Sequence, residues 1–425
     1  MPKPKQTPGL ALRLIAADQL QSILKGGNFV PLTAGDVADP RDRALGNRLI
    51  TTALRYHGPI NLLIAELLAR GLPKKSGRFE AVLRISLAQL LALPDLGDHS
   101  ALYLAGEAMR VDQKTQHLIK LMNGVLRAAQ RREPMRIDAA ALFPPFLLEG
   151  WRASYGETAV EAFGVALLEG APLDLTLKAE VPELDAAKVL ADTVRLVDRD
   201  RAVDQLPGFA DGRFWVQDAA AAIPARLMGL PQGARVLDIG AAPGGKSAQL
   251  IKAGYQVTAL DRDPARVERL RQNLARLGYA PTIVTADALD FIPDTPFEGV
   301  LLDAPCSATG TFRRHPEVVW HRDRADVSSR VKLQRQLINK AVDCLNSGGV
   351  LVYCVCSLEP EEGEMQADWA LTNGLEPLPI QPSELDGWAV PITEAGTGRT
   401  HPGQAVPGEK GGTLDGFFVA RFRRR

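Results

Sequence analysis

The chain has 425 residues, 46% of them hydrophobic, and its formal net charge is zero. This length predicts two to three domains at about 100–200 residues each. No apolar run approaches the ~20 residues that span a bilayer, and the first residues form no apolar signal segment, so we expect no membrane partner and a cytoplasmic location. All four cysteines lie in the last third of the chain, which makes a poor disulfide framework but a plausible site cluster.

The charges are unevenly distributed along the chain. Residues 1–142 carry eight more basic than acidic residues, residues 143–210 carry six more acidic than basic ones, and the remainder has an excess of two acidic residues. A basic N-terminal segment suggests a contact with nucleic acid. Arginines on solvated helix faces are the alternative explanation.

Residues 8–132 show the hydrophobic spacing of amphipathic helices. Glycine and proline clusters at 26–27, 71–73 and 94–97 are the expected breaks between them. An all-α bundle is therefore predicted for a first domain, residues 1–142.

Two segments of this bundle, DRALGNRLI at 42–50 and MNGVLR at 122–127, resemble the helical RNA-binding domain of the NusB family. That domain also occurs at the front of some rRNA methyltransferases. The resemblance implies that residues 1–142 bind RNA.

A composition shift at Phe143-Pro144-Pro145 marks the expected start of a second domain. Short helical segments at 146–152 and 158–163 precede a strand-like run at 173–178. A small α+β middle domain is predicted over residues 143–215.

From Arg235 on, strands alternate with helices, which predicts an α/β doubly wound, Rossmann-like domain with a mostly parallel sheet over residues 216–425. Its first unit, VLDIGAAPGGK at 236–246, predicts a buried strand, a glycine-rich turn and a helix start. Small residues let the backbone approach a ligand, and the helix start presents free N–H groups to it. An ordinary strand-to-helix turn is the alternative. The predicted cofactor-binding residues of this turn are Gly240, Ala241, Ala242, Pro243, Gly244, Gly245 and Lys246.

The turn is not the dinucleotide fingerprint G-x-G-x-x-G, because Pro243 occupies a spacer and the two glycines are adjacent. Three carboxylates, Asp261, Asp287 and Asp303, follow successive predicted strands. Open α/β sheets bind their ligands at the carboxyl ends of the strands, so we expect all three near the cofactor. Asp261 suits the acid that accepts hydrogen bonds from a ribose diol.

Cys306 and Cys356 each lie just past a predicted strand end. A thiolate nucleophile needs exposure and an electropositive setting, whereas a buried cysteine is a small hydrophobic residue. Zinc is the competing explanation for clustered thiols, but no C-x-x-C or finger-like spacing is present, and we predict no metal site. Cys354 would face the same side of the strand as Cys356. Cys356 is preferred because it lies where the strand exits.

The segment DAPCS at 303–307 and the pair Cys356-Ser357 resemble the two cysteine motifs of RNA (cytosine-5)-methyltransferases. Within that group the chain resembles the bacterial 16S rRNA family RsmB/Sun/Fmu over nearly its whole length. AAPGGK at 241–246 resembles the family's S-adenosyl-L-methionine loop, and the segments at 314–317 and 415–418 match in order and spacing. This implies S-adenosyl-L-methionine as cofactor and methylation of cytosine carbon 5 in small-subunit rRNA, at the family's position-967 site. We expect RNA and not DNA as partner, and a monomer.

The chain departs from the family pattern at three places. Cys354 and Val355 stand where a small residue and threonine are usual, Gly240 stands where cysteine is usual, and LTLK at 175–178 replaces Leu-Arg-Val-Asn. The last departure bears on an RNA contact from the middle domain, and the methyl-transfer core is unaffected.

The resemblance also implies a role for each catalytic residue. Cys356 adds to carbon 6 of cytosine, which makes carbon 5 able to attack a sulfonium methyl. Asp303 hydrogen-bonds and protonates the base at N3, Cys306 assists release, and the base must leave its stack.

Two alternative functions stay open. A tRNA (cytosine-5)-methyltransferase shares both cysteine motifs, and the N-terminal helical domain argues against it. An RNA-binding ribosome-assembly or antitermination factor would carry an inactive domain. The intact set Lys246, Asp303, Cys306 and Cys356 argues against that reading.

Overall fold

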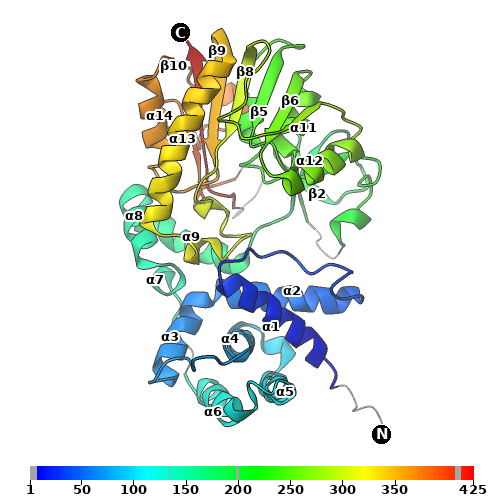
Figure 1. The fold of residues 1–425 in the computed structure, drawn as a ribbon, viewed down its shortest axis with the longest axis vertical. Helices are drawn as coiled ribbons and strands as arrows, with labels where there is room; N and C mark the ends of the chain where they lie inside the picture. The colour runs from blue at the N-terminus through cyan, green and yellow to red at the C-terminus, as the bar shows by residue number, and fades with distance from the viewer. Residues whose placement is uncertain (1–6, 134, 198–200, 407–412) are drawn as a thin grey trace. The chain divides into compact units, whose positions relative to one another are not determined.

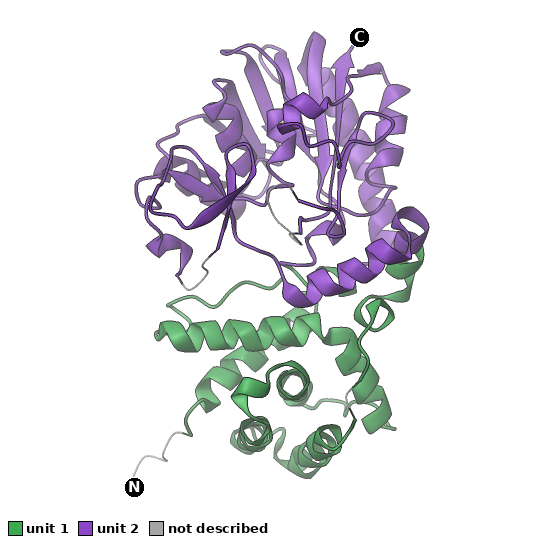
Figure 2. Cartoon of the chain, turned by 180° about the vertical axis from the view of Figure 1, so that it is seen from behind, with its two compact units in different colours: residues 1–149, 315–321 green, residues 150–314, 322–425 purple. Residues whose placement is uncertain are grey.

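The computed structural model describes residues 7–133, 135–197, 201–406 and 413–425. The chain divides into two compact units, which Figure 2 shows in different colours. Unit 1 comprises residues 1–149 and 315–321, and unit 2 comprises residues 150–314 and 322–425. The three-domain division with boundaries at 142 and 215 stays a prediction.

Unit 1 carries the predicted all-α bundle, which is confirmed. Helix α2 begins sharply because the Asp39 carboxylate accepts hydrogen bonds from the first backbone N–H groups and Pro40 occupies the first turn. Helix α4 is buried along most of its length and packs against α1, α2, α5 and α6, as its central place in Figure 1 shows. The helices are α1 (Leu10–Leu24), α2 (Pro40–Arg55), α3 (His57–Leu67), α4 (Phe79–Ala92), α5 (Asp98–Val111), α6 (Ile119–Gln130) and α7 (Ala139–Leu142).

Residues 315–321 also belong to unit 1, although they are distant from the bundle in sequence. The backbone N–H of Phe29 donates to Glu317 Oε1 at 2.9 Å. The ring of Trp320 lies 4.7 Å from that of His57, centroid to centroid. No pattern in the sequence predicted these contacts.

Helices α8 (Pro145–Tyr155) and α9 (Glu157–Glu169) precede an antiparallel sheet with strand order β2-β3-β1-β4. The buried Arg195 and Asp174 form an ion pair across β3 and β1 at 2.7 Å. This is the small α+β element that the sequence predicted. Its strands are β1 (Asp174–Leu177), β2 (Ala186–Leu190), β3 (Thr193–Leu196) and β4 (Phe214–Val216).

The second sheet of unit 2 has the order β10-β12-β9-β8-β5-β6-β7, with β11 paired to β12. Strands β5 to β9 run parallel, and β12 pairs antiparallel with β9. The strands are β5 (Arg235–Ile239), β6 (Gln256–Asp261), β7 (Thr282–Thr285), β8 (Phe297–Asp303), β9 (Leu345–Val355), β10 (Leu375–Pro377), β11 (Gly398–Thr400) and β12 (Phe417–Arg424).

Helices cover both faces of this sheet, as the doubly wound prediction requires. Alternate side chains of a strand face opposite sides, so Val236 belongs to a core cluster with residues of α10 and α11, while Leu237 belongs to a cluster with residues of α13 and α14. The helices are α10 (Ile223–Arg226), α11 (Gly245–Lys252), α12 (Pro264–Arg276), α13 (Arg324–Cys344) and α14 (Glu364–Leu371). Strand β5 lies between β6 and β8, so the strand order reverses beside it, where such folds bind ligands.

Within the described residues, no helix is both long and apolar enough to cross a membrane.

Candidate active site

The turn after β5 has the predicted strand, turn and helix in immediate succession. Gly240 has φ +79° and Gly244 has φ +109°, in the region that favours glycine. A Cβ at Gly240 would collide with the carbonyl oxygen of Asp303 on the neighbouring strand. Close approach of β5 and β8 therefore requires glycine at this position.

The strand-end acids gather where the sequence placed them. Asp261 is buried, and its Oδ2 accepts the backbone N–H of Ala242 at 3.2 Å and lies 3.4 Å from Arg266. Asp287 accepts the backbone N–H of Leu289 at 3.0 Å. Asp261 is thus bonded directly to the glycine-rich turn.

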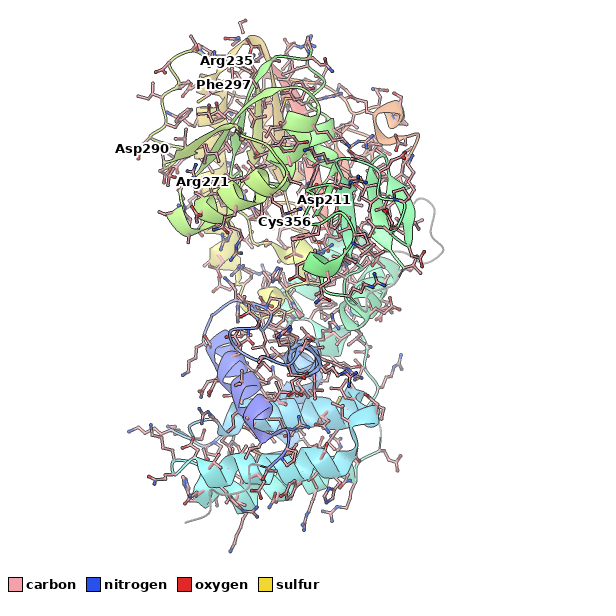
Figure 3. All side chains as sticks on the ribbon, turned by 90° about the vertical axis from the view of Figure 1, so that its right-hand side faces the viewer. Asp211, Arg235, Arg271, Asp290, Phe297 and Cys356 are labelled. Carbon is pink, nitrogen blue, oxygen red and sulfur yellow. The ribbon has the colours of Figure 1, made fainter. Side chains whose placement is uncertain are left out.

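A cavity of about 330 Å³ opens at this edge of the sheet. It is lined by six of the predicted site residues: Gly240, Asp261, Asp287, Asp303, Cys306 and Cys356. Residues 241–246 of the turn do not line it, while Arg262 and Arg266, which the sequence analysis did not single out, do. In Figure 3, Cys356 lies toward the end of the sheet opposite Arg235 and Phe297, which begin β5 and β8.

The cavity brings two of the four thiols together. Cys306 Sγ and Cys356 Sγ are 3.5 Å apart, with Cys306 buried and Cys356 partly exposed. The contact with Cys356 and burial together raise the pKa of Cys306 well above its ordinary value. Cys306 is therefore held as a neutral thiol beside Cys356.

Cys354 does not line this cavity. Its side chain is fully buried, with Sγ 3.8 Å from Asp303 Oδ1. Burial, and then the charge of Asp303, raise the pKa of Cys354 well above its ordinary value. Cys344, the remaining cysteine, is buried at the end of α13.

Lys246 pairs with Asp303, a contact that the sequence did not predict. Its Nζ lies 2.7 Å from Asp303 Oδ2 and 5.1 Å from the ring centroid of Phe417. Burial by itself would lower the pKa of Lys246, but the charge of Asp303, smaller contributions from the nearby thiols and the hydrogen bond to Asp303 together raise that pKa. The pair links α11 to the end of β8 and keeps a cation beside the thiols.

Sequence reasoning missed Asp238, a carboxylate inside β5. It is fully buried and accepts a hydrogen bond from Ser247 Oγ at 2.5 Å. A polar residue within the apolar run of β5 was the signal that could have found it.

Gln217 and Asp218, which follow β4, do not line the cavity. Asp218 Oδ2 accepts hydrogen bonds from Arg313 and Arg314. Both arginines also bond Asp415, so two segments that matched the family in sequence meet here in space. Burial opposes ionisation, but the two arginines lower the pKa of Asp218 to about 2.

A doubly wound sheet with a glycine turn and a cavity at its switch point is the architecture of α/β methyltransferases. A methyltransferase homologue from Pyrococcus horikoshii aligns with a TM-score of 0.55 and 26% identity, covering 67% of this chain and 96% of that one. The crystal structure of PH0851 shares the fold with a TM-score of 0.80 over 99% of this chain and 100% of the other, at 21% identity. The fold therefore groups the protein with the methyltransferases.

Sequence comparison is more specific. The model of the 16S rRNA methyltransferase RsmB/F family matches residues 225–423, and that of the NusB family matches residues 11–131. Proteins named ribosomal RNA small subunit methyltransferase B from Xanthomonas campestris and Escherichia coli are 37% and 31% identical to it. Each alignment covers 97% of this chain, and 97% and 99% of the two relatives. The chain belongs to the RsmB/F family of 16S rRNA methyltransferases.

Proposed function

We propose that the protein transfers a methyl group from S-adenosyl-L-methionine to carbon 5 of a cytosine in 16S rRNA, at the family's position-967 site, through a covalent Cys356–cytosine intermediate. The observation that carries this is the pair of thiols 3.5 Å apart in a cavity next to a glycine turn. A methyltransferase acting on an atom more nucleophilic than carbon 5 of cytosine has no need of two thiols. The partner is RNA, not DNA, and the protein acts as a monomer in the cytoplasm.

The residues present fit the cofactor. The turn around Gly240 comes close to β8 with no Cβ in the way, and Asp261, Asp287 and Asp303 surround the adjacent cavity. S-adenosyl-L-methionine supplies an electrophilic sulfonium methyl when bound. We assign its binding to residues 240–246 together with these three carboxylates, with Asp261 accepting hydrogen bonds from the ribose hydroxyls.

The thiolate of Cys356 forms a bond to carbon 6 of the cytosine while Asp303, in its protonated form, gives its proton to N3 of the base. The electron pair displaced from the 5,6 double bond makes carbon 5 an enamine-like nucleophile, which takes the methyl group. The carbon 5 proton is then lost to water and N3 returns its proton to Asp303, and Cys306 assists this release. The bond between carbon 6 and Cys356 then breaks, which restores the double bond and the thiolate.

The environments of the thiols support this division of roles. Cys356 is the more exposed of the two cavity thiols, and Lys246 lies nearby as a cation. Cys306 is buried and its raised pKa favours the protonated form. Cys354 is set back from the cavity in the core.

The test replaces each cysteine with alanine and measures both methylation and the amount of covalent protein–RNA adduct. Cys356→Ala should abolish methylation and form no covalent adduct. Cys306→Ala should accumulate a protein–RNA adduct that survives denaturing electrophoresis, and Cys354→Ala should do neither. An adduct that persists in Cys356→Ala but disappears in Cys354→Ala would reverse the assignment, and adducts in no variant would exclude covalent catalysis.

The alternative functions give different results in the same assay. With labelled cofactor, a tRNA methyltransferase would label tRNA in preference to 16S rRNA. An inactive assembly factor would bind RNA and label neither. Mapping the modified nucleotide would identify the position.

A further inference from the structure

Each cysteine of the cavity is followed by a serine, and both serines reach one buried carboxylate, Glu362. Glu362 Oε2 accepts hydrogen bonds from Ser307 Oγ at 2.5 Å and from Ser357 Oγ at 2.6 Å. The backbone N–H of Ser307 donates to Glu362 Oε1 at 2.9 Å. A single side chain therefore connects the Cys306 loop to the Cys356 loop.

An arginine holds each loop from its carbonyl side. Arg322 Nε donates to the carbonyl oxygen of Ser307 at 2.8 Å, and Arg399 Nη1 donates to that of Ser357. The residue after each cysteine is thus fixed at its hydroxyl by Glu362 and at its carbonyl by a cation. The same arrangement occurs twice, once in each loop.

Glu362 is itself fixed from two further directions. Gln334 of α13 donates from Nε2 to Glu362 Oε1 and to the carbonyl oxygen of Pro305, both at 3.0 Å. Tyr353 Oη donates to the backbone carbonyl of Glu362 at 2.6 Å. The carboxylate has no exposed surface and does not line the cavity.

A buried carboxylate is expensive unless several donors compensate for its lost hydration. Here the donors come from both cysteine loops and from α13. The network therefore fixes the positions of the two loops, and with them the two thiols that a covalent mechanism uses. A thiol displaced by about 1 Å can lose a hundredfold in rate, which makes such rigidity valuable.

We propose that Glu362 is a positioning residue that sets the placement of the Cys306 and Cys356 thiols relative to each other and to the target base. This proposal rests on the proposed function, because it assumes that the two thiols carry out covalent catalysis. Glu362 itself is given no contact with substrate or cofactor. Glu362 also contributes its negative charge, after the contact with Cys356 and burial, to the raised pKa of Cys306. The same residue thereby helps to keep Cys306 protonated.

The experiment uses the full chain with Cys306→Ala, in which the covalent adduct accumulates, and adds Glu362→Gln. Glutamine keeps the size of the side chain and removes its charge. We expect adduct formation in a single turnover to slow roughly ten- to a hundredfold, while the Kd for S-adenosyl-L-methionine and the RNA concentration for half-maximal rate change less than about twofold. Glu361→Gln, at an exposed neighbouring position, is the matched control and should leave all three values unchanged.

Equal adduct rates with and without Glu362→Gln would overturn the positioning role and leave the proposed function standing. A parallel loss of cofactor affinity and thermal stability would also overturn it, because that is the signature of a general structural defect. Absence of adduct in Cys306→Ala with Glu362 intact would instead overturn the covalent function.

A second variant covers the case in which Glu362→Gln does not fold. Ser357→Ala removes one hydroxyl from the network and leaves the carboxylate and its other donors in place. We expect adduct formation to slow about three- to tenfold, the size of one hydrogen bond. An unchanged rate in this variant would count against the proposal.

Discussion

Three cysteine thiols lie near one edge of the sheet and differ in how far they are exposed to solvent. Cys354 is completely buried, Cys306 is 8% exposed, and Cys356 is partly exposed in the cavity. Burial disfavours a thiolate because the charge loses its hydration. The thiol with the best access to solvent and substrate is therefore Cys356, which is the residue that we propose as nucleophile.

At Asp261 we predict a loss of cofactor affinity without loss of fold. Asp261→Ala removes two charge-assisted acceptors from the proposed ribose site, so the Kd for S-adenosyl-L-methionine should rise roughly ten- to a hundredfold. Titration calorimetry measures this Kd directly. Asp290→Ala, on the exposed surface after β7, is the control. Unchanged affinity in folded Asp261→Ala would remove this residue from the site.

At Asp238 we predict a pH dependence of stability. Burial raises the pKa of Asp238 to about 7, against the opposing hydrogen bond from Ser247. The folded-state pKa lies above the unfolded value of about 3.9, so stability that is present below that value is lost as the pH rises toward 7. Asp238→Asn should flatten this decline.

The measurement is the unfolding free energy or melting temperature at about pH 5 and at about pH 8. Between these two pH values, the unfolding free energy of wild type should fall by on the order of 2–4 kcal/mol more than that of Asp238→Asn. Burial also raises the pKa of Glu359 to about 7, so part of the wild-type decline will remain in the variant. Identical profiles for the two proteins would show that Asp238 is ionised in the folded state.

At the scale of elements, the turn between β5 and α11 lies directly against the end of the neighbouring strand β8. Gly240 and Gly233 both have positive φ, +79° and +84°. Only Gly240 would bring a Cβ against another strand, since nothing lies within 4 Å of a Cβ at Gly233. Substitution of Gly233 therefore measures the cost of backbone strain alone, whereas substitution of Gly240 adds the cost of a clash with β8.

We predict that Gly233→Ala loses about 1–2 kcal/mol, the strain of a left-handed alanine. Gly240→Ala should lose at least about 1 kcal/mol more and bind S-adenosyl-L-methionine more weakly, because β5 must move away from Asp303. Denaturant midpoints and cofactor titration provide the comparison. Equal losses in the two variants would mean that the sheet absorbs the added methyl group.

At the scale of the whole molecule, the zero net charge conceals a basic region and an acidic one. Eight excess positive charges lie in residues 1–142, the part that contains the NusB family match. Basic side chains gain affinity for nucleic acid by releasing counterions from the phosphates. We therefore predict that this region provides most of the salt-dependent rRNA binding and that unit 2 carries out the chemistry.

Neutralising the exposed pair Lys74 and Lys75 with Lys74→Gln/Lys75→Gln should weaken rRNA binding and flatten its salt dependence, by a slope of roughly 0.7 for each lost phosphate contact on single strands. Methyl transfer at saturating RNA should be unchanged. The control is Arg269→Gln/Arg271→Gln on the exposed face of α12. If both double variants changed the slope equally, the basic region would have no special part in binding.

The sequence by itself determined the helical bundle, the parallel sheet and the collection of acids and thiols at one edge. This was possible because parallel strands bring their carboxyl ends to the same side, so Asp261, Asp303 and Cys356 had to approach the turn at Gly240 once the strands were recognised. Hydrophobic period and glycine position are local signals, and both are read directly from the chain.

The sequence favoured Cys356 over Cys354 because of its place at the strand exit, and the tertiary structure shows that Cys356 and not Cys354 lines the cavity. Strand periodicity places Cys354 and Cys356 on one side, but β9 ends at Val355, so Cys354 stays in the core while Cys356 lies beyond the strand. Only the tertiary structure decided that Glu362 joins both cysteine loops and that Lys246 pairs with Asp303. The Glu362–Ser307 and Lys246–Asp303 contacts connect residues 55 and 57 positions apart through packing, and no local pattern of residues encodes them.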